Sequence, residues 1–183
     1  MNGPAPATPS LPPLRRRAAA ALPGALLALL LGLSTLDHDF VQDDHFVIVD
    51  NPQVRSLASL PEIFSTPYTH YAGLNRPASD HRPMPIATFA LEWQVAGSRP
   101  FLYHLDNALL HALVTFLVGL LAWRVAREPS AALWTGLVFA VMPVHCDNVG
   151  SVTERSSLLA LLFGLGFLLT HDRTRASARI ASP

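Results

Sequence analysis

Four apolar stretches recur along the 183-residue chain, separated by polar or arginine-rich segments, and they cover residues 18–36, 101–123, 129–144 and 156–170. As a helix rising about 1.5 Å per residue, the first stretch reaches about 28 Å, close to the hydrocarbon thickness of a bilayer. A cleaved signal peptide has the same basic-then-apolar order, but residues 33–39 lack a convincing cleavage site, so we expect an uncleaved anchor. The pattern predicts an all-α integral membrane protein with about four transmembrane helices.

The last two stretches are shorter than the roughly 17 to 25 residues that an independent span needs. We expect them to form a helical hairpin whose ends dip into a polar cavity, with residues 145–155 as the turn. Residues 101–123 carry His104, Asp106 and His111 in their first half, and these side chains should face protein or water.

A long polar segment, residues 37–100, follows the first stretch and holds eight of the 13 acidic residues. It should lie outside the bilayer as a large first loop. Within it, apolar residues recur every three or four positions over residues 54–64, and Ser59 with Glu62 matches a capping box. This pattern indicates a short amphipathic helix, lying either at the membrane interface or in an ordinary soluble environment.

Composition supports a membrane location, because half of the residues are hydrophobic and only 14% are charged, against roughly 25% in soluble domains. The net charge is zero, so nothing suggests a nucleic-acid partner. Every basic residue is an arginine, which hints at a bacterial source. Cys146 is alone, so an intrachain disulfide is excluded.

The arginines predict the orientation, because basic residues gather on the cytoplasmic side of short loops. Eight of the 13 lie at residues 15–17, 124–127 and 173–179. We therefore expect residues 1–17 to form a disordered basic cytoplasmic tail, residues 171–183 a second cytoplasmic tail, and residues 37–100 and 145–155 to be extracytoplasmic.

The acidic cluster after the first stretch is the first candidate for chemistry. Asp43 and Asp44 are adjacent and are bracketed by His38 and His45. One carboxylate can take a proton from a hydroxyl while its neighbour raises its basicity, or the set can hold a divalent cation such as Mg or Mn. Acidic residues in a loop are also commonly only solvated.

A second cluster lies in the turn before the last stretch, where Asp147, Ser151, Glu154 and Arg155 would share one side of a helix. Arg155 can bind a lipid phosphate through its planar donors, or it can snorkel or pair with Glu154. Arg82, late in the long loop, offers a second cation for the same phosphate.

The order of these pieces resembles the beginning of the GT-C membrane glycosyltransferases, particularly the O-mannosyltransferases with transmembrane and tetratricopeptide repeat regions and their bacterial relatives. The matching stretches, in the family's order, are VQDDHFVIVDNPQV, HRPMPIATFALEW, RPFLYHLDNALLHALVTFLVGLLAW and FAVMPVHCDNVGSVTERSSLLALLF. They cover residues 37 to 170.

The resemblance implies a bundle of many helices with a large first extracytoplasmic loop, here incomplete. It also implies a sugar donor on a polyprenyl phosphate and a protein or glycan hydroxyl as acceptor. By position, Asp43 becomes the catalytic base and Asp44 its support or metal contact. The family's later motif falls on His145, Asp147 and Glu154 as supporting residues and on Arg155 as the proposed phosphate ligand. Two of these positions depart from the family: Asp147 replaces the usual Glu, and Glu154 replaces the usual Gly.

Three functions stay open on this sequence. The first is a glycosyltransferase of the bacterial inner membrane, active on the periplasmic face. The second is a noncatalytic fragment or assembly partner of a split enzyme with a further membrane subunit, because the four stretches are fewer than the family's helices and no repeat is visible. The third is a metal-binding or transport fragment using His38, Asp43, Asp44 and His45.

Overall fold

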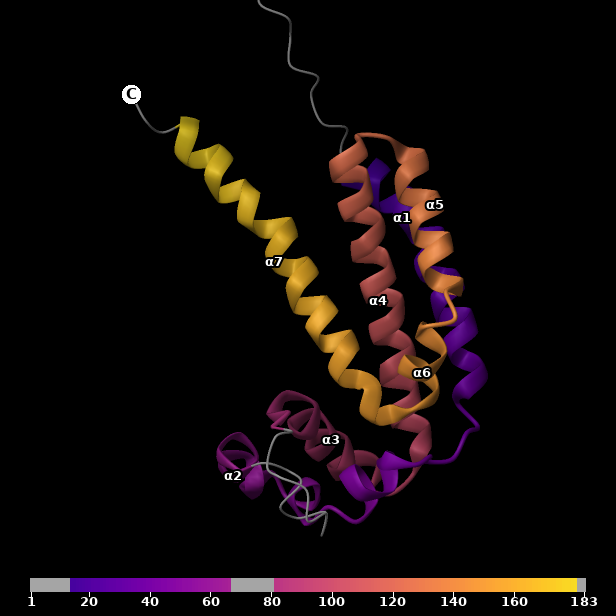
Figure 1. Cartoon of the computed structure of the whole chain (residues 1–183), viewed down its shortest axis with the longest axis vertical. Helices are drawn as coiled ribbons and strands as arrows, with labels where there is room; N and C mark the ends of the chain where they lie inside the picture. Colours follow the sequence, from indigo (N-terminus) through magenta and orange to yellow (C-terminus); the bar gives the residue numbers. More distant parts are fainter. Residues whose placement is uncertain (1–13, 67–80, 181–183) are drawn as a thin grey trace, which may run out of the picture.

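A computed structural model describes residues 14–66 and 81–180 of the chain, and every regular element in these two ranges is helical (Figure 1). Three of the helical segments are long and apolar enough to cross a membrane, at Leu14–Thr35, Pro100–Ala126 and Val152–His171. The expected all-α membrane architecture is therefore confirmed. The disordered tail expected over residues 1–17 is wrong at its end, because residues 14–17 form the first turn of a helix, whereas residues 1–13 lie outside the described residues.

Three helices form the tightest part of the bundle. They are α1 (Leu14–Gly32), α4 (Pro100–Ala126) and α5 (Pro129–Val141), and each contacts the other two. Lipid gives helices no hydrophobic driving force to associate, so they associate through close packing, and small residues let their backbones approach each other. A Cβ added to Gly24 would lie 2.5 Å from the backbone of Gly136, and one added to Gly119 would lie 3.0 Å from Ala21. Glycine is thus required at the α1–α5 contact.

Helix α5 has 13 residues and is shorter than a span needs. A short helix α6 (His145–Gly150) follows it, and a 3-10 turn at Val152–Glu154 then leads into α7 (Arg155–Ile180). Between the two, Ser151 has an extended backbone, with φ −102° and ψ 126°. The predicted single helical side for the polar residues of 147–155 is therefore wrong, because the helix breaks in the middle of the set.

Helix α7 starts against α4 and leans away from it towards its other end (Figure 1). Arg124, in the last turn of α4, donates hydrogen bonds from Nη1 to the carbonyl oxygens of Leu168 and Leu169, both at 2.9 Å. The two helices therefore touch near the start of α7 and are bridged by a long side chain further along. Helix α7 is continuous to Ile180, so the segment expected as a tail from residue 171 is helical where it is described.

The segment after α1 is a small packed unit, not an open loop. Residues 37–66 and 83–99, which we call the cap, include a π-helical turn at His45–Val49, a short α2 (Leu60–Ser65) and α3 (Pro83–Ala96). Its core joins apolar side chains from these elements to the start of α4 and the turn before α7: Phe40, Val47, Ile48, Val54, Ile63, Ile86, Phe89, Ala90, Tyr103 and Val152.

The amphipathic helix expected over residues 54–64 is divided into two 3-10 turns and α2. The predicted capping box is wrong, because the side chain of Ser59 makes no cap hydrogen bond. Ser56 caps instead, accepting a hydrogen bond from Ala58 N at 3.2 Å. Val54 and Ile63 are buried in the cap core as the apolar pattern indicated.

Figure 1 shows the start of α1, the α4–α5 connection and the far end of α7 at one end of the bundle, and the cap at the other. The arginine-rich segments thus share one end of the molecule. Which side of a membrane that end faces stays a prediction.

Candidate functional site

The two adjacent aspartates after α1 have opposite environments. Asp44 is fully buried, and its carboxylate accepts backbone hydrogen bonds from Val41 N (3.1 Å), Val152 N (3.2 Å) and Thr153 N (2.9 Å). The hydroxyl of Ser151 also donates to it, at 3.4 Å. Asp44 therefore ties the segment after α1 to the turn before α7.

Asp43 is exposed, one residue after a strained position. Gln42 has φ 44°, in the left-handed region that non-glycine residues rarely adopt. The turn is closed on both sides, because Asp44 N donates to Val41 O at 2.9 Å while the Asp44 side chain accepts from Val41 N. These hydrogen bonds hold the strained turn at Gln42 in place, and in this turn Asp44 is buried while Asp43 is exposed.

Asp43 lines a small hollow between the segment after α1, the start of α3 and the 3-10 turn before α7. Its other polar lining residues are Arg82, Thr153 and Glu154, and its apolar wall includes Val47 and Phe89. Arg82 precedes the first residue of α3 and donates from Nη1 to the hydroxyl of Ser156 at 3.4 Å. The structure therefore brings together Asp43, Arg82 and Glu154, three of the residues singled out from the sequence.

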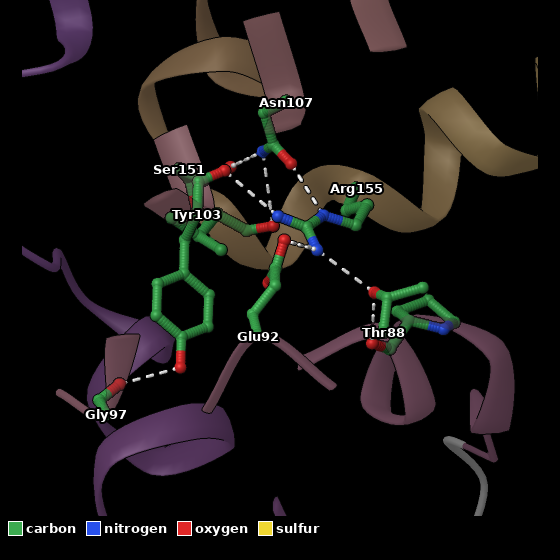
Figure 2. Close-up of polar contacts among 9 residues, drawn as sticks. Thr88, Glu92, Gly97, Tyr103, Asn107, Ser151 and Arg155 are labelled. Carbon is green, nitrogen blue, oxygen red and sulfur yellow. Dashed lines mark hydrogen bonds and ion pairs between the residues drawn. The ribbon is translucent and has the colours of Figure 1, made fainter. Parts of the chain in front are cut away.

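Arg155 is only 1% exposed, and its guanidinium is held by four residues on two other helices, α3 and α4 (Figure 2). Nε donates to Asn107 Oδ1 at 2.7 Å, and Nη1 donates to Glu92 Oε1 at 2.6 Å and to Thr88 Oγ1 at 3.0 Å. Nη2 donates to the carbonyl oxygen of Tyr103 at 2.9 Å. Arg155 thus pairs with Glu92 on α3, not with its chain neighbour Glu154, and it joins α3, α4 and α7.

Asn107 completes this junction. Its amide nitrogen donates to the carbonyl oxygens of Ser151 and Val152, both at 3.3 Å, while its oxygen accepts from Arg155. The planar guanidinium of Arg155 donates to several fixed acceptors on α3 and α4 at once, which the ammonium group of a lysine would not do. The arginine and the asparagine together fix the turn that also carries the backbone donors for Asp44.

Glu92 has the most perturbed carboxyl outside the membrane-spanning helices. Burial raises the pKa of Glu92 to about 8, and the neighbouring Asp106 carboxyl adds to the rise, whereas the guanidinium of Arg155 lowers it. Sequence analysis did not single out Glu92, Thr88 or Asn107. The signal was the i, i+4 spacing of Thr88 and Glu92, which places two polar groups on one side of a mostly apolar helix.

The remaining residues of the later motif lie away from the hollow. His145 is buried, with its ring centroid 4.2 Å from that of Phe139 and 4.9 Å from that of His111. Burial lowers the pKa of His145. Asp147 is exposed, and its carbonyl oxygen accepts a hydrogen bond from Ser151 N at 2.9 Å.

The histidines beside the acidic pair do not converge on it. The His38 ring meets His104 edge to face at 6.1 Å, and His45 Nε2 lies 3.1 Å from the carbonyl oxygen of Phe40. Within residues 14–66 and 81–180, no three His, Cys, Asp or Glu side chains come together as metal ligands do. The carboxylate of Asp44 is taken up by backbone N–H groups and Asp43 is exposed, so the acidic pair does not converge on one point, and we derive no step through a metal.

Most of the chain is similar in sequence to curated proteins named protein O-mannosyl-transferases. Protein O-mannosyl-transferase TMTC1 of Homo sapiens is 36% identical over 171 residues, which are 88% of this chain and 19% of that protein. Tmtc1 of Drosophila melanogaster is 32% identical over 152 residues (80% and 17%), and TMTC3 of Homo sapiens is 29% identical over 141 residues (74% and 15%). The chain spans about a fifth of the length of these relatives. No family model and no solved structure matches it.

Proposed function

We propose that this chain, a relative of the protein O-mannosyl-transferases, forms part of a multi-pass membrane glycosyltransferase. The donor in this proposal is a sugar on a polyprenyl phosphate, and the acceptor is a protein or glycan hydroxyl. The reaction takes place at the extracytoplasmic end of the bundle, which a bacterial chain would present to the periplasm. The names of the relatives support the transferase class, and the apolar helices support the membrane location.

One observation carries the proposal: Asp43 and Arg82 line the same hollow at the cap end of the bundle. An exposed carboxylate and an arginine border this hollow, next to the ends of membrane-spanning helices where lipid head groups lie. A polyprenyl phosphate held at the interface presents its phosphate at this depth. A base for the acceptor and a cation for the leaving group are therefore available in one place.

The chemistry follows from these two groups. The acceptor oxygen attacks the anomeric carbon of the donor while Asp43 takes its proton, and the bond from that carbon to the phosphate oxygen breaks. The lipid phosphate leaves with the electron pair, and Arg82 stabilises the charge that it gains. The products are the glycosylated acceptor and the polyprenyl phosphate, with inversion at the sugar carbon.

The other residues act through structure in this proposal. Asp44 supports Asp43 by closing its turn, and Arg155 fixes the segment that carries Thr153 and Glu154. Arg155 makes four hydrogen bonds to protein groups, so the contact with the phosphate is assigned to Arg82 alone. Glu154 borders the hollow, where its charge limits how closely a phosphate approaches Arg82.

The test is transfer by membranes that contain the chain with whatever further subunits its native assembly holds. Labelled polyprenyl-phosphate sugars are added, and label in protein or glycan is measured for the wild type, Asp43→Asn and Asp39→Asn. We expect Asp43→Asn to lose on the order of a hundredfold in turnover, as general bases do. The exposed Asp39→Asn variant, outside the hollow, should match the wild type.

Equal turnover of all three proteins would remove Asp43 from the mechanism. An absence of transfer from any polyprenyl-phosphate sugar, in membranes where the assembly is present and folded, would favour the noncatalytic assembly partner instead.

A further inference from the structure

Helix α3 presents an exposed apolar face as well as a buried one. Met84, Leu91 and Val95 are 44%, 56% and 78% exposed. At about 100° per residue, these three side chains fall on one side of the helix. The opposite side, which includes Phe89 and Ala90, is buried in the cap core. Helix α3 is therefore apolar on two sides, one packed against protein and one open.

The exposed side of α3 lacks the charge that a water-facing helix carries. Glu92 is the only charged residue among the 14 of this helix, and it is buried, with its carboxylate 2.6 Å from the guanidinium of Arg155. The surface helix of a water-soluble domain normally turns charged and polar side chains outwards. An exposed face without them marks a contact with a partner or a membrane.

Helix α3 is joined directly to a helix that is long enough to cross a membrane. Only residues 97–99 lie between the end of α3 and the start of α4. The Tyr103 hydroxyl donates to Gly97 O at 2.8 Å, and Gly97 N donates to Trp93 O at 2.9 Å. These bonds tie the connection to both helices, so the last turn of α3 lies beside the cap end of α4.

The exposed face of α3 also turns towards the exposed leucines of α4. Thr88 lies only about 40° from Met84 around the helix axis. It borders a cleft whose α4 wall includes Leu109 and Leu113, which are 48% and 44% exposed. The bilayer that covers these two leucines of a spanning helix is therefore next to the exposed face of α3.

The residues around this helix suit the head-group region of a membrane. Arg82 precedes the first residue of α3 and Arg99 follows its last turn, and both side chains are exposed. Trp93 is half-buried, with the guanidinium of Arg55 5.8 Å from its ring centroid. Tryptophan is enriched at membrane–water interfaces, and arginine binds phosphate through its planar donors.

We propose that α3 lies in the interface of the membrane, with Met84, Leu91 and Val95 among the lipid chains and the two flanking arginines at the phosphate groups. This position removes the three apolar side chains from water, as in other interfacial helices. The cap is then held on the bilayer by α3 as well as by the spanning helices. The inference does not rest on the transfer reaction, because contact with lipid is measured directly.

Spin labels measure this contact in phosphatidylcholine bilayers. A nitroxide is attached to one cysteine, from Leu91→Cys or Val95→Cys, in a Cys146→Ser background. Oxygen concentrates in the bilayer and a nickel chelate stays in water, so the ratio of their collision rates reports what surrounds the label. We expect this ratio to be at least about fivefold higher than for exposed Asp50→Cys in the cap, as the exclusion of a polar reagent from lipid implies.

Two further variants calibrate the ratio. Gln94→Cys is the matched control, because Gln94 is exposed on the same helix but lies about 100° around its axis from Val95. Its ratio should be lower than that of Val95→Cys. Phe163→Cys, exposed in a spanning segment of α7, gives the value for full contact with lipid. Leu91 and Val95 are labelled separately, so either site decides if the other variant fails to fold.

Free access of the nickel chelate to positions 91 and 95, as at position 50, would overturn the proposal. Equal ratios at positions 94 and 95 would overturn it too, because the exposed face would then not differ from the side of the helix. Low collision rates with both reagents would show that a protein segment, not lipid, covers this face.

Discussion

The carboxylate of Asp44 accepts a hydrogen bond from the backbone N–H of Thr153 at 2.9 Å, across 109 residues of chain. The same carboxylate receives Val152 N and Val41 N, so one buried side chain satisfies three backbone donors from two segments. Its neighbour Asp43 faces the hollow, so the two aspartates should respond to mutation in different ways.

Asp44→Asn should lower the free energy of unfolding by about 1 to 3 kcal/mol, the typical cost of leaving buried polar groups unsatisfied. The amide puts two donors where the carboxylate accepted from Val152 and Val41, so at least one N–H loses its partner. Thermal unfolding in detergent, compared with Asp43→Asn and Asp39→Asn, measures the effect. A variant as stable as these two exposed controls would show that the Asp44 bonds contribute nothing.

Arg155→Lys should also destabilise the protein, although it keeps the positive charge beside Glu92. A lysine cannot reach Asn107 Oδ1, Tyr103 O and Glu92 Oε1 together, so buried acceptors at the junction of α3, α4 and α7 lose their donors. We expect a loss of about 1 to 3 kcal/mol by thermal unfolding. Arg127→Lys, at an exposed position after α4, is the matched control, and equal melting temperatures for the two variants would contradict the prediction.

The stability of the protein should depend on pH through Glu92. Its pKa rises from 4.5 to about 8 on folding, so between these pH values the folded chain holds a proton that the unfolded chain has lost. The slope of the unfolding free energy with pH is then negative in this window, and the contribution of the proton is gone above about pH 8.

Glu92→Gln removes this titration while keeping the shape of the protonated acid. The melting temperature of the wild type should therefore fall steadily relative to that of Glu92→Gln between pH 5 and 8. Above pH 8 the difference between the two proteins should stay constant. Exposed Glu128→Gln serves as the control. A difference that stays constant from pH 5 to 9 would mean that Glu92 is ionised throughout.

Gly24→Ala should weaken the packing of α1 on α5. The added Cβ would lie 2.5 Å from the backbone of Gly136, where no flexible side chain can move aside. Overpacking of this kind typically costs about 1 to 3 kcal/mol. Gly166→Ala on α7, where a Cβ meets open space, should be neutral or slightly stabilising because alanine favours helix. Unfolding measurements that rank the two variants equally would argue against close α1–α5 contact.

The orientation prediction can be tested by labelling with a membrane-impermeant thiol reagent in a Cys146→Ser background. A cysteine at exposed Asp39, in the cap, should react from the extracytoplasmic side, and one at exposed Glu128, between α4 and α5, should react only after the membrane is opened. The reverse pattern would place the arginine-rich end outside and would move the proposed reaction to the cytoplasm.

The apolar stretches determined the class of fold, because runs that long and that uncharged form helices in a membrane whatever their neighbours. The acidic pair and its place beside the first helix could also be identified from residue types and order. What periodicity did not reveal was the cap core, because Phe40, Ile63 and Val152 meet through contacts between segments far apart in the chain.

The sequence by itself determined that Asp43, Asp44 and Arg155 stand near the ends of apolar stretches, since charged side chains are costly inside the hydrocarbon, and that Arg82 lies in the long loop. Only the tertiary structure decided their separate roles. Burial and backbone donors make Asp44 a structural link, a strained turn leaves Asp43 exposed, and Glu92 and Asn107 engage Arg155. The physical reason is that desolvation and hydrogen-bond partners are set by residues from other segments, which the local pattern does not contain.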